Sequence, residues 1–352
     1  MNYQLIKPLL FKLDPEFAHS LAEYFLKTLD FTFPSALSLF AQDCIINDER
    51  LEQELLGLKF SNPVGIAGGF DKNATMIRPL ATLGFGFLEF GTFTPKAQAG
   101  NDKPRLFRLV KQESLQNAMG FNNAGSARIA QNLSRLYPFV LPLGANIGKN
   151  KTTPNEEALK DYFILLKEFD KLCDYFIINI SSPNTKNLRA LQNDEFLKEL
   201  LSEAKRLTSK PILIKIAPDM SVKDALKLCE NAILHKASGF IIANTSTDYS
   251  LLDNNRTFGG ISGKLIQEKS RTFFKALAKE LFGKTLLISS GGIDSAKEAY
   301  ERIKDGASLV QIYTGFIFKG PSLAKDINEG LLEFMQKDKI KDISELIGVN
   351  IK

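Results

Sequence analysis

Eight short apolar runs recur along this chain, and longer amphipathic segments alternate with them. Apolar runs of this length, separated by helical patterns, are typical of parallel strands that are buried on both faces. Strands that are joined by helices pair in parallel, because each helix returns the chain to the same end of the sheet. We therefore predict strands at residues 63–69, 86–92, 141–148, 175–182, 211–217, 239–245, 285–292 and 309–315. The main helices are predicted at 155–169, 194–208, 221–236, 264–282, 295–304 and 322–337.

Eight strands alternating with helices match the size of a closed (β/α)8 barrel, which typically takes about 250 residues. An open, doubly wound sheet is the competing arrangement, but it concentrates polar residues at one switch point. Here polar residues follow all eight strands, which favours the closed barrel. The expected fold class is α/β, a TIM barrel with a small N-terminal helical extension.

The first residues differ from the rest, so we divide the chain into an N-terminal segment, 1–42, and a barrel, 43–352. Residues 14–16 (Asp-Pro-Glu) form a helix-start pattern, and apolar residues then recur at spacings of three and four. A second short helix is predicted at 35–40. Two amphipathic helices of this kind are typical of segments that lie in a membrane interface, and packing on the barrel is the alternative.

Composition excludes several classes of protein. The chain has 352 residues, of which 44% are hydrophobic and 24% charged, as in ordinary globular proteins. Its net charge of +5 comes from scattered Lys and Arg, so we expect no nucleic-acid partner. Three widely separated cysteines and two histidines argue against a disulfide framework and against a metal site, and they favour the cytoplasm. No run approaches the roughly 18–20 apolar residues that span a membrane.

Amides, hydroxyls and glycines gather where the predicted strands end. This face of a β/α barrel carries the ligand, although any single Asn or Gly is equally well explained as a cap or turn residue. Asp71 is the one acid among them, so a hydrolase with paired carboxylates or a metal is poorly supported. Lys215 lies in an apolar strand, where a lysine that points inward needs an anion. Glycines at 291–292 and 315, after the last two strands, favour a phosphate site.

These residues belong to longer segments that resemble the dihydroorotate dehydrogenases, in particular the membrane-associated class that reduces quinones. The segments are AGGFDK at 67–72, GNDKPRLFR at 100–108, MGFNN at 119–123, NIGKN at 146–150, INISSPNT at 178–185, KIAPD at 215–219 and SLVQIY at 308–313. The resemblance implies that (S)-dihydroorotate is oxidised to orotate in pyrimidine (UMP) biosynthesis. It also implies that one FMN per chain takes the hydride and that a membrane quinone is the final electron acceptor.

The resemblance also implies roles for single residues. Ser182 matches the catalytic base that removes the C5 proton, and Thr185 and Phe121 match residues that shape the proton path. A serine is a poor base, so it needs a closed, dry site. The soluble class has Cys at this position, so Ser182 favours the quinone class. Substrate contacts are expected at Lys72, Asn117, Ala118, Met119, Gly120, Phe121, Asn179, Asn184, Asn244 and Thr245. FMN contacts are expected at Ala67, Gly68, Gly69, Thr92, Asn146, Asn179, Lys215, Ala243, Gly263, Gly292, Tyr313 and Thr314.

Ala243 departs from the family pattern, which often has Thr immediately before the Asn at position 244. A hydroxyl hydrogen bond to the flavin is lost, so we expect FMN binding to be weaker by about 1 kcal/mol. In the same comparison Lys215 would stabilise reduced flavin, which is anionic near N1.

Quinones dissolve in lipid, so the second half-reaction requires contact with a membrane. The resemblance implies that residues 3–42 form a tunnel to the flavin in the membrane interface, with His19 and Arg105 beside the quinone head. We expect a monomer that binds the membrane surface through residues 1–42, as a peripheral protein on the cytoplasmic face of the cell membrane.

Two alternative functions fit many of the same residues. One is a flavin barrel that reduces a different pyrimidine or uses a soluble electron acceptor. The other is a barrel that binds a phosphorylated ligand without redox chemistry, as an isomerase or a non-catalytic binding protein. The colour of the purified protein separates the last class from the others, because a bound flavin makes the protein yellow.

Overall fold

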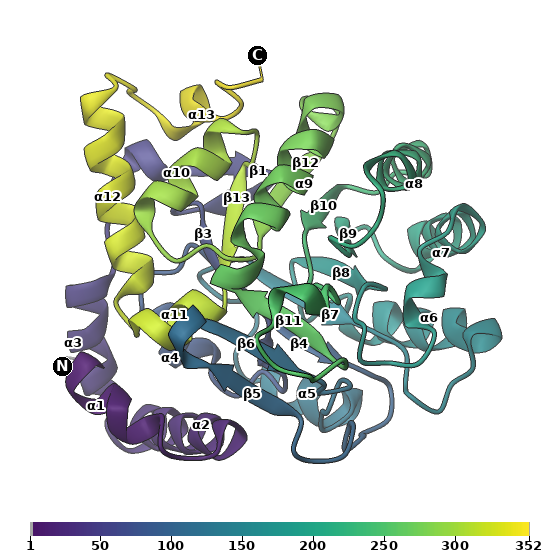
Figure 1. Ribbon diagram of the computed structural model, residues 1–352, viewed down its shortest axis with the longest axis horizontal. Coiled ribbons are helices and arrows are strands. Elements are labelled where there is room, and N and C mark those ends of the chain that lie inside the picture. The colour runs from purple at the N-terminus through teal and green to yellow at the C-terminus, as the bar shows by residue number, and fades with distance from the viewer. Residues whose placement is uncertain (1–2, 352) are drawn as a thin grey trace.

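The computed structural model describes residues 3–351 and contains a closed barrel of parallel strands (Figure 1). Residues 1, 2 and 352, which fall in the two predicted segments, lie outside the described part. In order around the barrel, the strands are β3 (Val64–Asp71), β4 (Phe87–Phe93), β7 (Leu143–Ile147), β8 (Tyr175–Asn179), β9 (Ile212–Ile216), β10 (Gly239–Ile242), β12 (Leu286–Ser290) and β13 (Leu309–Ile312). β13 pairs with β3 and closes the ring. All eight predicted strands and the TIM-barrel fold are therefore confirmed.

Helices surround the barrel, as Figure 1 shows. They are α4 (Ile77–Ala81), α5 (Ser126–Leu133), α6 (Ala158–Phe169), α7 (Asp194–Leu207), α8 (Val222–Leu234), α9 (Gln267–Leu281), α10 (Ala296–Lys304), α11 (Thr314–Lys319), α12 (Leu323–Lys337) and α13 (Ile343–Leu346). Short 3-10 turns lie at η1 (Glu49–Leu51), η2 (Val110–Gln112), η3 (Asn155–Glu157), η4 (Leu188–Leu191), η5 (Tyr249–Leu251) and η6 (Lys264–Ile266). The six predicted helices are confirmed. Several begin at side-chain caps, since Asn193, Ser221 and Ser295 each accept a hydrogen bond from a backbone N–H three residues later.

Successive strand residues point alternately into the barrel and outward under the helices. On β4, Phe87 joins the interior cluster, while Leu88 and Phe90 pack in the outer core. The interior cluster consists of Phe60, Phe87, Tyr175, Ile177, Leu213, Ile241, Leu286, Ile288 and Leu309. Gly65 leaves room for one of these rings, because a Cβ there would overlap the ring of Phe87. Apolar packing therefore fills the barrel near the strand starts and leaves the other end to polar residues.

A hairpin lies at the apolar end of the barrel. It is formed by β1 (Gln53–Leu55) and β2 (Leu58–Phe60), which pair antiparallel. The ring of Phe60 meets that of Phe87 edge-on, with 5.6 Å between the centroids. This contact closes the barrel opposite the end where the polar residues gather.

The long connection after β4 contains two strands that sequence patterns did not predict. β5 (Leu106–Leu109) and β6 (Ser114–Asn117) join β11 (Gly260–Gly263), which follows β10, in an antiparallel sheet of order β11-β6-β5. Figure 1 shows this sheet in the lower middle of the molecule, beside β4 and below β3 and β13. It contacts the loops after β8 and β10, so it covers the C-terminal mouth of the barrel.

Three helices, rather than the two predicted, form the N-terminal extension: α1 (Tyr3–Leu10), α2 (Pro15–Thr32) and α3 (Pro34–Cys44). The missed helix α1 contains Pro8 and is held by a tertiary contact, in which Tyr3 Oη donates to Ile317 O at 2.6 Å. The predicted start of α2 is confirmed, because Asp14 accepts a hydrogen bond from the Phe17 N–H at 3.0 Å. Within residues 3–351, the structure contains no helix with the length and apolarity needed to cross a membrane.

Candidate active site

A network of amides and hydroxyls joins the ends of four barrel strands. Asn179 Nδ2 donates to Thr92 Oγ1 at 2.8 Å and to Asn146 Oδ1 at 3.3 Å, and Thr92 Oγ1 also donates to Asn146 Oδ1. Asn244 Nδ2 donates to Asn179 Oδ1 at 3.3 Å and to Ser181 Oγ at 2.9 Å. Barrel closure thus brings together four residues that were predicted from separate motifs, and adds Ser181.

A second amide pair links the mouth to the sheet that covers it. Asn184, after β8, donates from Nδ2 to Asn117 Oδ1 on β6 at 2.9 Å. Asn101 then holds both sides, since its Nδ2 donates to Asn184 O at 2.9 Å and to Ala118 O at 3.0 Å. Asn101 was not predicted as a site residue, although it lies in a segment that carried the family resemblance. It fixes the covering loop, the connection of residues 94–125 that contains β5 and β6, against the loop that bears Ser182.

Ser182 is buried at the same mouth, with 7% of its surface exposed. Its Oγ accepts a hydrogen bond from the Asn184 N–H at 3.2 Å. Phe121, 9% exposed, lies over Gly148, where an added Cβ would come within 2.9 Å of both the Phe121 ring and the Thr92 methyl. The absence of a side chain at Gly148 therefore lets Phe121 help to exclude water from this part of the mouth.

Several buried polar atoms at this mouth have no hydrogen-bond partner among the described residues. They include Asn184 Oδ1, Thr185 Oγ1 and Thr245 Oγ1. A buried polar atom without a partner costs about 1–3 kcal/mol, so proteins rarely retain a group of them without a ligand. Acceptors and donors of this kind beside the amide network point to a polar, hydrogen-bonding ligand.

Lys215 points into the barrel, and the anion that it needs belongs to the chain itself. Its Nζ lies 3.6 Å from Glu89 Oε1 on β4. Asp71, the one acid among the strand-end residues, does not contact Lys215. Asp71 instead accepts hydrogen bonds from the backbone N–H groups of Thr75 at 2.9 Å and Met76 at 2.7 Å. Glu89 is missed when only strand ends are considered. It follows Phe87 by two residues, however, so both side chains lie on the inward face of β4.

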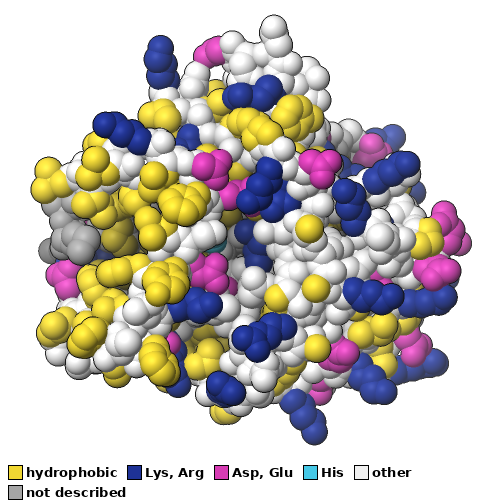
Figure 2. All heavy atoms as spheres, turned by 90° about the horizontal axis from the view of Figure 1, so that it is seen from below, with side chains coloured by type: hydrophobic (Ala, Val, Ile, Leu, Met, Phe, Trp, Pro, Cys, Tyr) yellow, Lys and Arg dark blue, Asp and Glu magenta, His cyan; other side chains and the backbone are white. Residues whose placement is uncertain are grey.

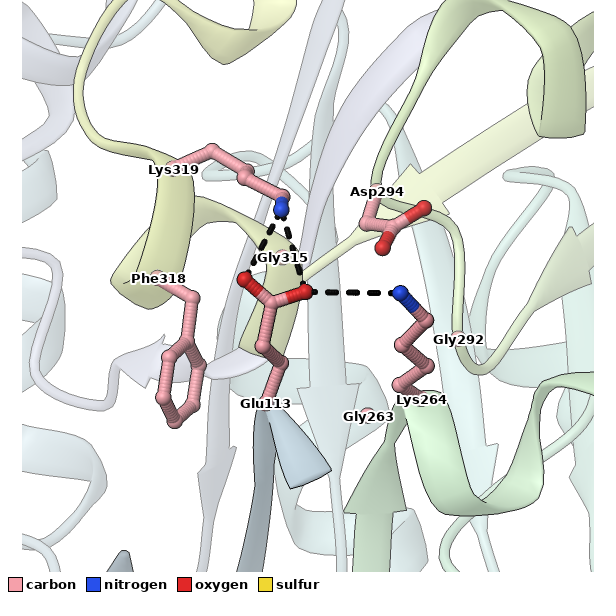
Figure 3. A pocket seen from close by; sticks show the side chains of 8 residues that line it. All are labelled: Glu113, Gly263, Lys264, Gly292, Asp294, Gly315, Phe318 and Lys319. Atoms are coloured by element: carbon pink, nitrogen blue, oxygen red, sulfur yellow. Dashed lines mark hydrogen bonds and ion pairs between the residues drawn. The ribbon is translucent and has the colours of Figure 1, made fainter. Parts of the chain in front are cut away.

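Glycines form a narrow cavity where the phosphate site was predicted (Figure 3). Gly263 and Gly292 have φ values of +94° and +79°, which favour glycine, and a Cβ on Gly292 would lie 2.5 Å from Gln267 Cα. Lys319 Nζ donates to both oxygens of Glu113 at 2.8 and 3.0 Å, which holds the pKa of that carboxyl below its usual value. Glu113 lies in the turn between β5 and β6, and Gly263 lies on β11, so the covering sheet borders the cavity.

The other predicted residues lie around the same mouth. Tyr313 Oη donates to Gly69 O at 3.2 Å, and Thr314 Oγ1 donates to Ser262 Oγ at 2.9 Å. The N–H of Ala243 donates to Ser290 O at 3.1 Å. Ala118, Met119 and Gly120 follow β6 in the covering loop, Ala67 and Gly68 lie on β3, and Asn117 Nδ2 reaches Gly260 O at 3.4 Å.

Lys72 lies between the barrel and the N-terminal helices, and burial lowers the pKa of its ammonium group. The same helices bring His19 close by. The imidazole of His19 meets the Phe70 ring edge-on with 5.1 Å between centroids, and burial together with Lys72 lowers its pKa to about 4. His19 is therefore neutral at pH 7.

Arg105 anchors the covering loop to α2. Its Nη2 lies 2.9 Å from Glu16 Oε1, and its Nη1 donates to Ala99 O and Asn101 O at 2.6 Å each. The guanidinium is thus held by Glu16 and by two backbone carbonyl groups. Sequence patterns missed Glu16 as a partner, since it had been explained as a helix-start residue.

The N-terminal helices turn an apolar face outward. Figure 2 shows hydrophobic side chains gathered on this side of the molecule. This exposed apolar face consists of Leu5, Ile6, Leu9, Phe17, Leu21, Tyr24, Phe25, Phe31, Phe33 and Leu39. In α2 only Ala18 is fully buried and Leu26 packs partly against the core, so packing on the barrel does not account for the exposed Phe17, Leu21 and Phe25. Exposed patches of this kind mark binding surfaces.

Comparisons with known proteins agree with this arrangement. A sequence model of the family described as Dihydroorotate dehydrogenase matches residues 50–335. The chain is 58% identical to the dihydroorotate dehydrogenase (quinone) of a Nitratiruptor species and 54% identical to that of Sulfurimonas denitrificans, with 100% of each chain covered. Two crystal structures of DHODH from Eimeria tenella, one with ferulenol and one ligand-free, superpose with a TM-score of 0.86 at 32% identity. The match covers 96% of this chain and 96% and 100% of theirs.

Proposed function

The chain belongs to the dihydroorotate dehydrogenase family, and we propose that the C-terminal mouth of its barrel oxidises (S)-dihydroorotate to orotate, with a quinone as the final electron acceptor. The reaction belongs to pyrimidine biosynthesis. The observation that carries the assignment to this mouth is a group of buried polar atoms that have no partner within residues 3–351, Asn184 Oδ1, Thr185 Oγ1 and Thr245 Oγ1, beside the amide network. A planar cyclic amide with a carboxylate supplies partners of the required kinds.

The family is one of flavoenzymes, and FMN is the form that fits this chain. A narrow cavity between glycines that tolerate no Cβ suits a phosphate, and the buried amides and Lys215 suit a polar heterocycle. Gly263, Gly292 and Thr314 would hold the phosphate, while Thr92, Asn146, Asn179 and Lys215 would hold the ring. When bound, FMN accepts a hydride from the substrate and passes electrons to the quinone.

The substrate is held by side chains from three separate loops. Asn117 and Asn184 already pair with each other, and Asn244 belongs to the network of the strand ends. Lys72 suits the substrate carboxylate, because burial destabilises its charge and an anion restores it. With the covering loop closed by Asn101, these contacts orient the ring and exclude water.

Ser182 takes the proton from C5 of the substrate at its Oγ. The Asn184 N–H donates to one lone pair of Oγ and so fixes its position, the other lone pair remains for the proton, and Phe121 limits the access of water. As Oγ takes the C5 proton, it gives up its own hydroxyl proton, and Thr185 Oγ1, which has no partner among the described residues, would receive that proton by way of water and pass it outward. The base is weak, so its burial and orientation supply much of the effect.

Replacing Ser182 tests this function. Ser182→Ala should retain flavin but lose reduction by dihydroorotate at neutral pH by at least about 100-fold, the usual contribution of a positioned base. Ser182→Cys restores an ionisable group of lower pKa, so its activity should return with a pH profile displaced to lower pH. Stopped-flow measurement of flavin bleaching reports both. Normal bleaching in Ser182→Ala, or a wild-type protein that binds no flavin, contradicts the proposal.

The segment 1–42 is the membrane and quinone segment in this proposal, and 43–352 is the flavin barrel. The exposed apolar face lets the protein bind a membrane peripherally. In this proposal the protein is a monomer on the cytoplasmic face of the cell membrane. His19 lies one aromatic ring from Tyr313, since Phe70 contacts both, at 5.1 and 5.7 Å between centroids. This proximity supports a quinone beside His19, and Arg105 would act through Glu16.

Vesicle binding tests the membrane segment. Phe17→Asp with Phe25→Asp should abolish co-flotation with phospholipid vesicles and reduce turnover of a long-chain quinone, while bleaching by dihydroorotate stays unchanged. Leu234→Asp is the matched control, because Leu234 is also highly exposed but ends α8 on the far side of the barrel (Figure 1). Equal flotation of the double variant and wild type would refute the assignment.

A further inference from the structure

A fully buried carboxylate, Glu89, lies inside the barrel and has no part in the reaction described above. Its side chain is 0% exposed, and it sits on β4 two residues after Phe87, which points into the apolar interior cluster. A buried charge without partners is strongly unfavourable. The contacts of Glu89 therefore indicate what this charge does.

Glu89 contacts residues of three other barrel strands. Its Oε1 accepts a hydrogen bond from Asn146 Nδ2 and lies 3.6 Å from Lys215 Nζ, and its Oε2 accepts from Gln311 Nε2. A Cβ on Gly68 would overlap Oε1. Gly68, Asn146 and Lys215 are three of the residues assigned to the flavin. One carboxylate thus touches several parts of the surface that would receive the cofactor.

The charge of Glu89 opposes that of Lys215 at the same place. Lys215 is 6% exposed, and Glu89 is the one carboxylate paired with it among residues 3–351. Charges act strongly on each other and on their surroundings where water is excluded. The ammonium of Lys215 favours a reduced, anionic flavin, and the carboxylate of Glu89 disfavours it.

We infer that Glu89 is a positioning residue for the flavin site, which fixes Lys215 and Asn146 and whose negative charge limits how far Lys215 raises the midpoint potential of the flavin. The inference rests on the proposed function, because it requires a flavin at this mouth. A site with an unopposed Lys215 would hold reduced flavin more tightly and release electrons to a quinone less readily.

The variant Glu89→Gln removes the charge and nearly preserves the shape. Gln311 Oε1 has no partner among the described residues, so the Gln311 amide can turn over and accept from the introduced amide. The affinity for reduced flavin relative to oxidised flavin should rise at least about tenfold, which for a two-electron couple is a rise of about 30 mV in midpoint potential. Equilibration of the purified holoenzyme with dyes of known potential measures this shift.

A matched control is Asp305→Asn, because Asp305 is also a fully buried, ion-paired carboxylate but lies after α10 and contacts Lys275 and Arg271 instead of the flavin residues. This variant should change the free energy of unfolding without changing the midpoint potential. The comparison separates an effect of the Glu89 charge from a general effect of neutralising a buried carboxylate.

The double variant Lys215→Gln with Glu89→Gln keeps the test available if Glu89→Gln alone does not fold, because the pair then buries no charge. Lys215→Gln alone should lower the potential, and adding Glu89→Gln to it should raise the potential again. An unchanged potential in Glu89→Gln, or an equal potential in the Lys215 single and double variants, would overturn the inference. A wild-type protein that binds no flavin would instead refute the proposed function.

Discussion

Gly292 offers the sharpest test of the phosphate cavity. Its φ of +79° lies in the left-handed region, and an added Cβ would lie 2.5 Å from Gln267 Cα and 3.0 Å from Gln267 N. These are backbone atoms at the start of α9, so they cannot move aside as a flexible side chain can. Gly292→Ala should therefore distort the turn that would hold the phosphate.

The expected loss in the free energy of unfolding of Gly292→Ala has two parts. Gly283 has nearly the same φ, +76°, but nothing lies within 4 Å of a Cβ there. Gly283→Ala should cost only the left-handed strain, about 1–2 kcal/mol in the free energy of unfolding. Gly292→Ala adds overpacking against Gln267, about 1–3 kcal/mol. The total for Gly292→Ala is therefore about 2–5 kcal/mol.

Flavin titration shows whether the distortion reaches a phosphate site. The apoprotein is titrated with FMN and with riboflavin, which lacks the phosphate, by quenching of flavin fluorescence. The preference for FMN over riboflavin should fall at least about tenfold in Gly292→Ala, or about 1.4 kcal/mol, and should stay unchanged in Gly283→Ala. Equal destabilisation of the two variants, or an unchanged preference in Gly292→Ala, would refute the reasoning.

Three other changes have defined outcomes. The pKa of His19 is lowered from 6.5 to about 4 in the folded protein. Between these two pH values, His19 therefore binds a proton in the unfolded chain but not in the folded one. Stability should fall as the pH drops from about 6.5 toward 4, and His19→Gln should reduce that slope by up to one proton, about 1.4 kcal/mol per pH unit, in urea titrations at several pH values. Glu16→Gln should lower the free energy of unfolding by about 1–3 kcal/mol and speed proteolysis of the N-terminal helices, because it weakens a largely buried ion pair with Arg105. The control Glu203→Gln changes an exposed ion pair with Arg206 and should lower the free energy of unfolding by less than about 1 kcal/mol. Lys72→Met should raise the KM for dihydroorotate far more than it lowers the affinity for flavin, and equal losses would count against its contact with the substrate carboxylate.

The periodic pattern of the sequence predicts the barrel because that information is local. Each strand is a run of apolar residues, and each helix has caps and an apolar face of its own, such as Asn193 before α7. Eight such units admit few arrangements, so the closed barrel follows. The sheet of β5, β6 and β11 could not be predicted in the same way, because its strands join residues 106–117 to residues 260–263. That pairing depends on where two loops meet over the barrel mouth.

The candidate site likewise contains residues that local motifs indicate and contacts that only the folded chain brings about. The motifs around Ser182, Asn146 and Lys215 indicate in the sequence which residues face a ligand, and the family resemblance supplies their expected roles. The partner of Lys215 is different, because Glu89 lies far from it in the sequence and meets it only when β4 and β9 close into one ring. The carboxylate partner of Arg105 was missed for a related reason, since Glu16 lies 89 residues away in the chain and meets the guanidinium only in the folded structure.

The sequence by itself therefore determined the eight strands, the end of the barrel that is polar and the family to which its motifs are similar, because hydrophobic periodicity and short motifs act within a few residues. Only the tertiary structure decided which charges neutralise each other and which apolar face remains exposed. Those outcomes depend on distances between residues far apart in the chain, and such distances are set by strand order and register.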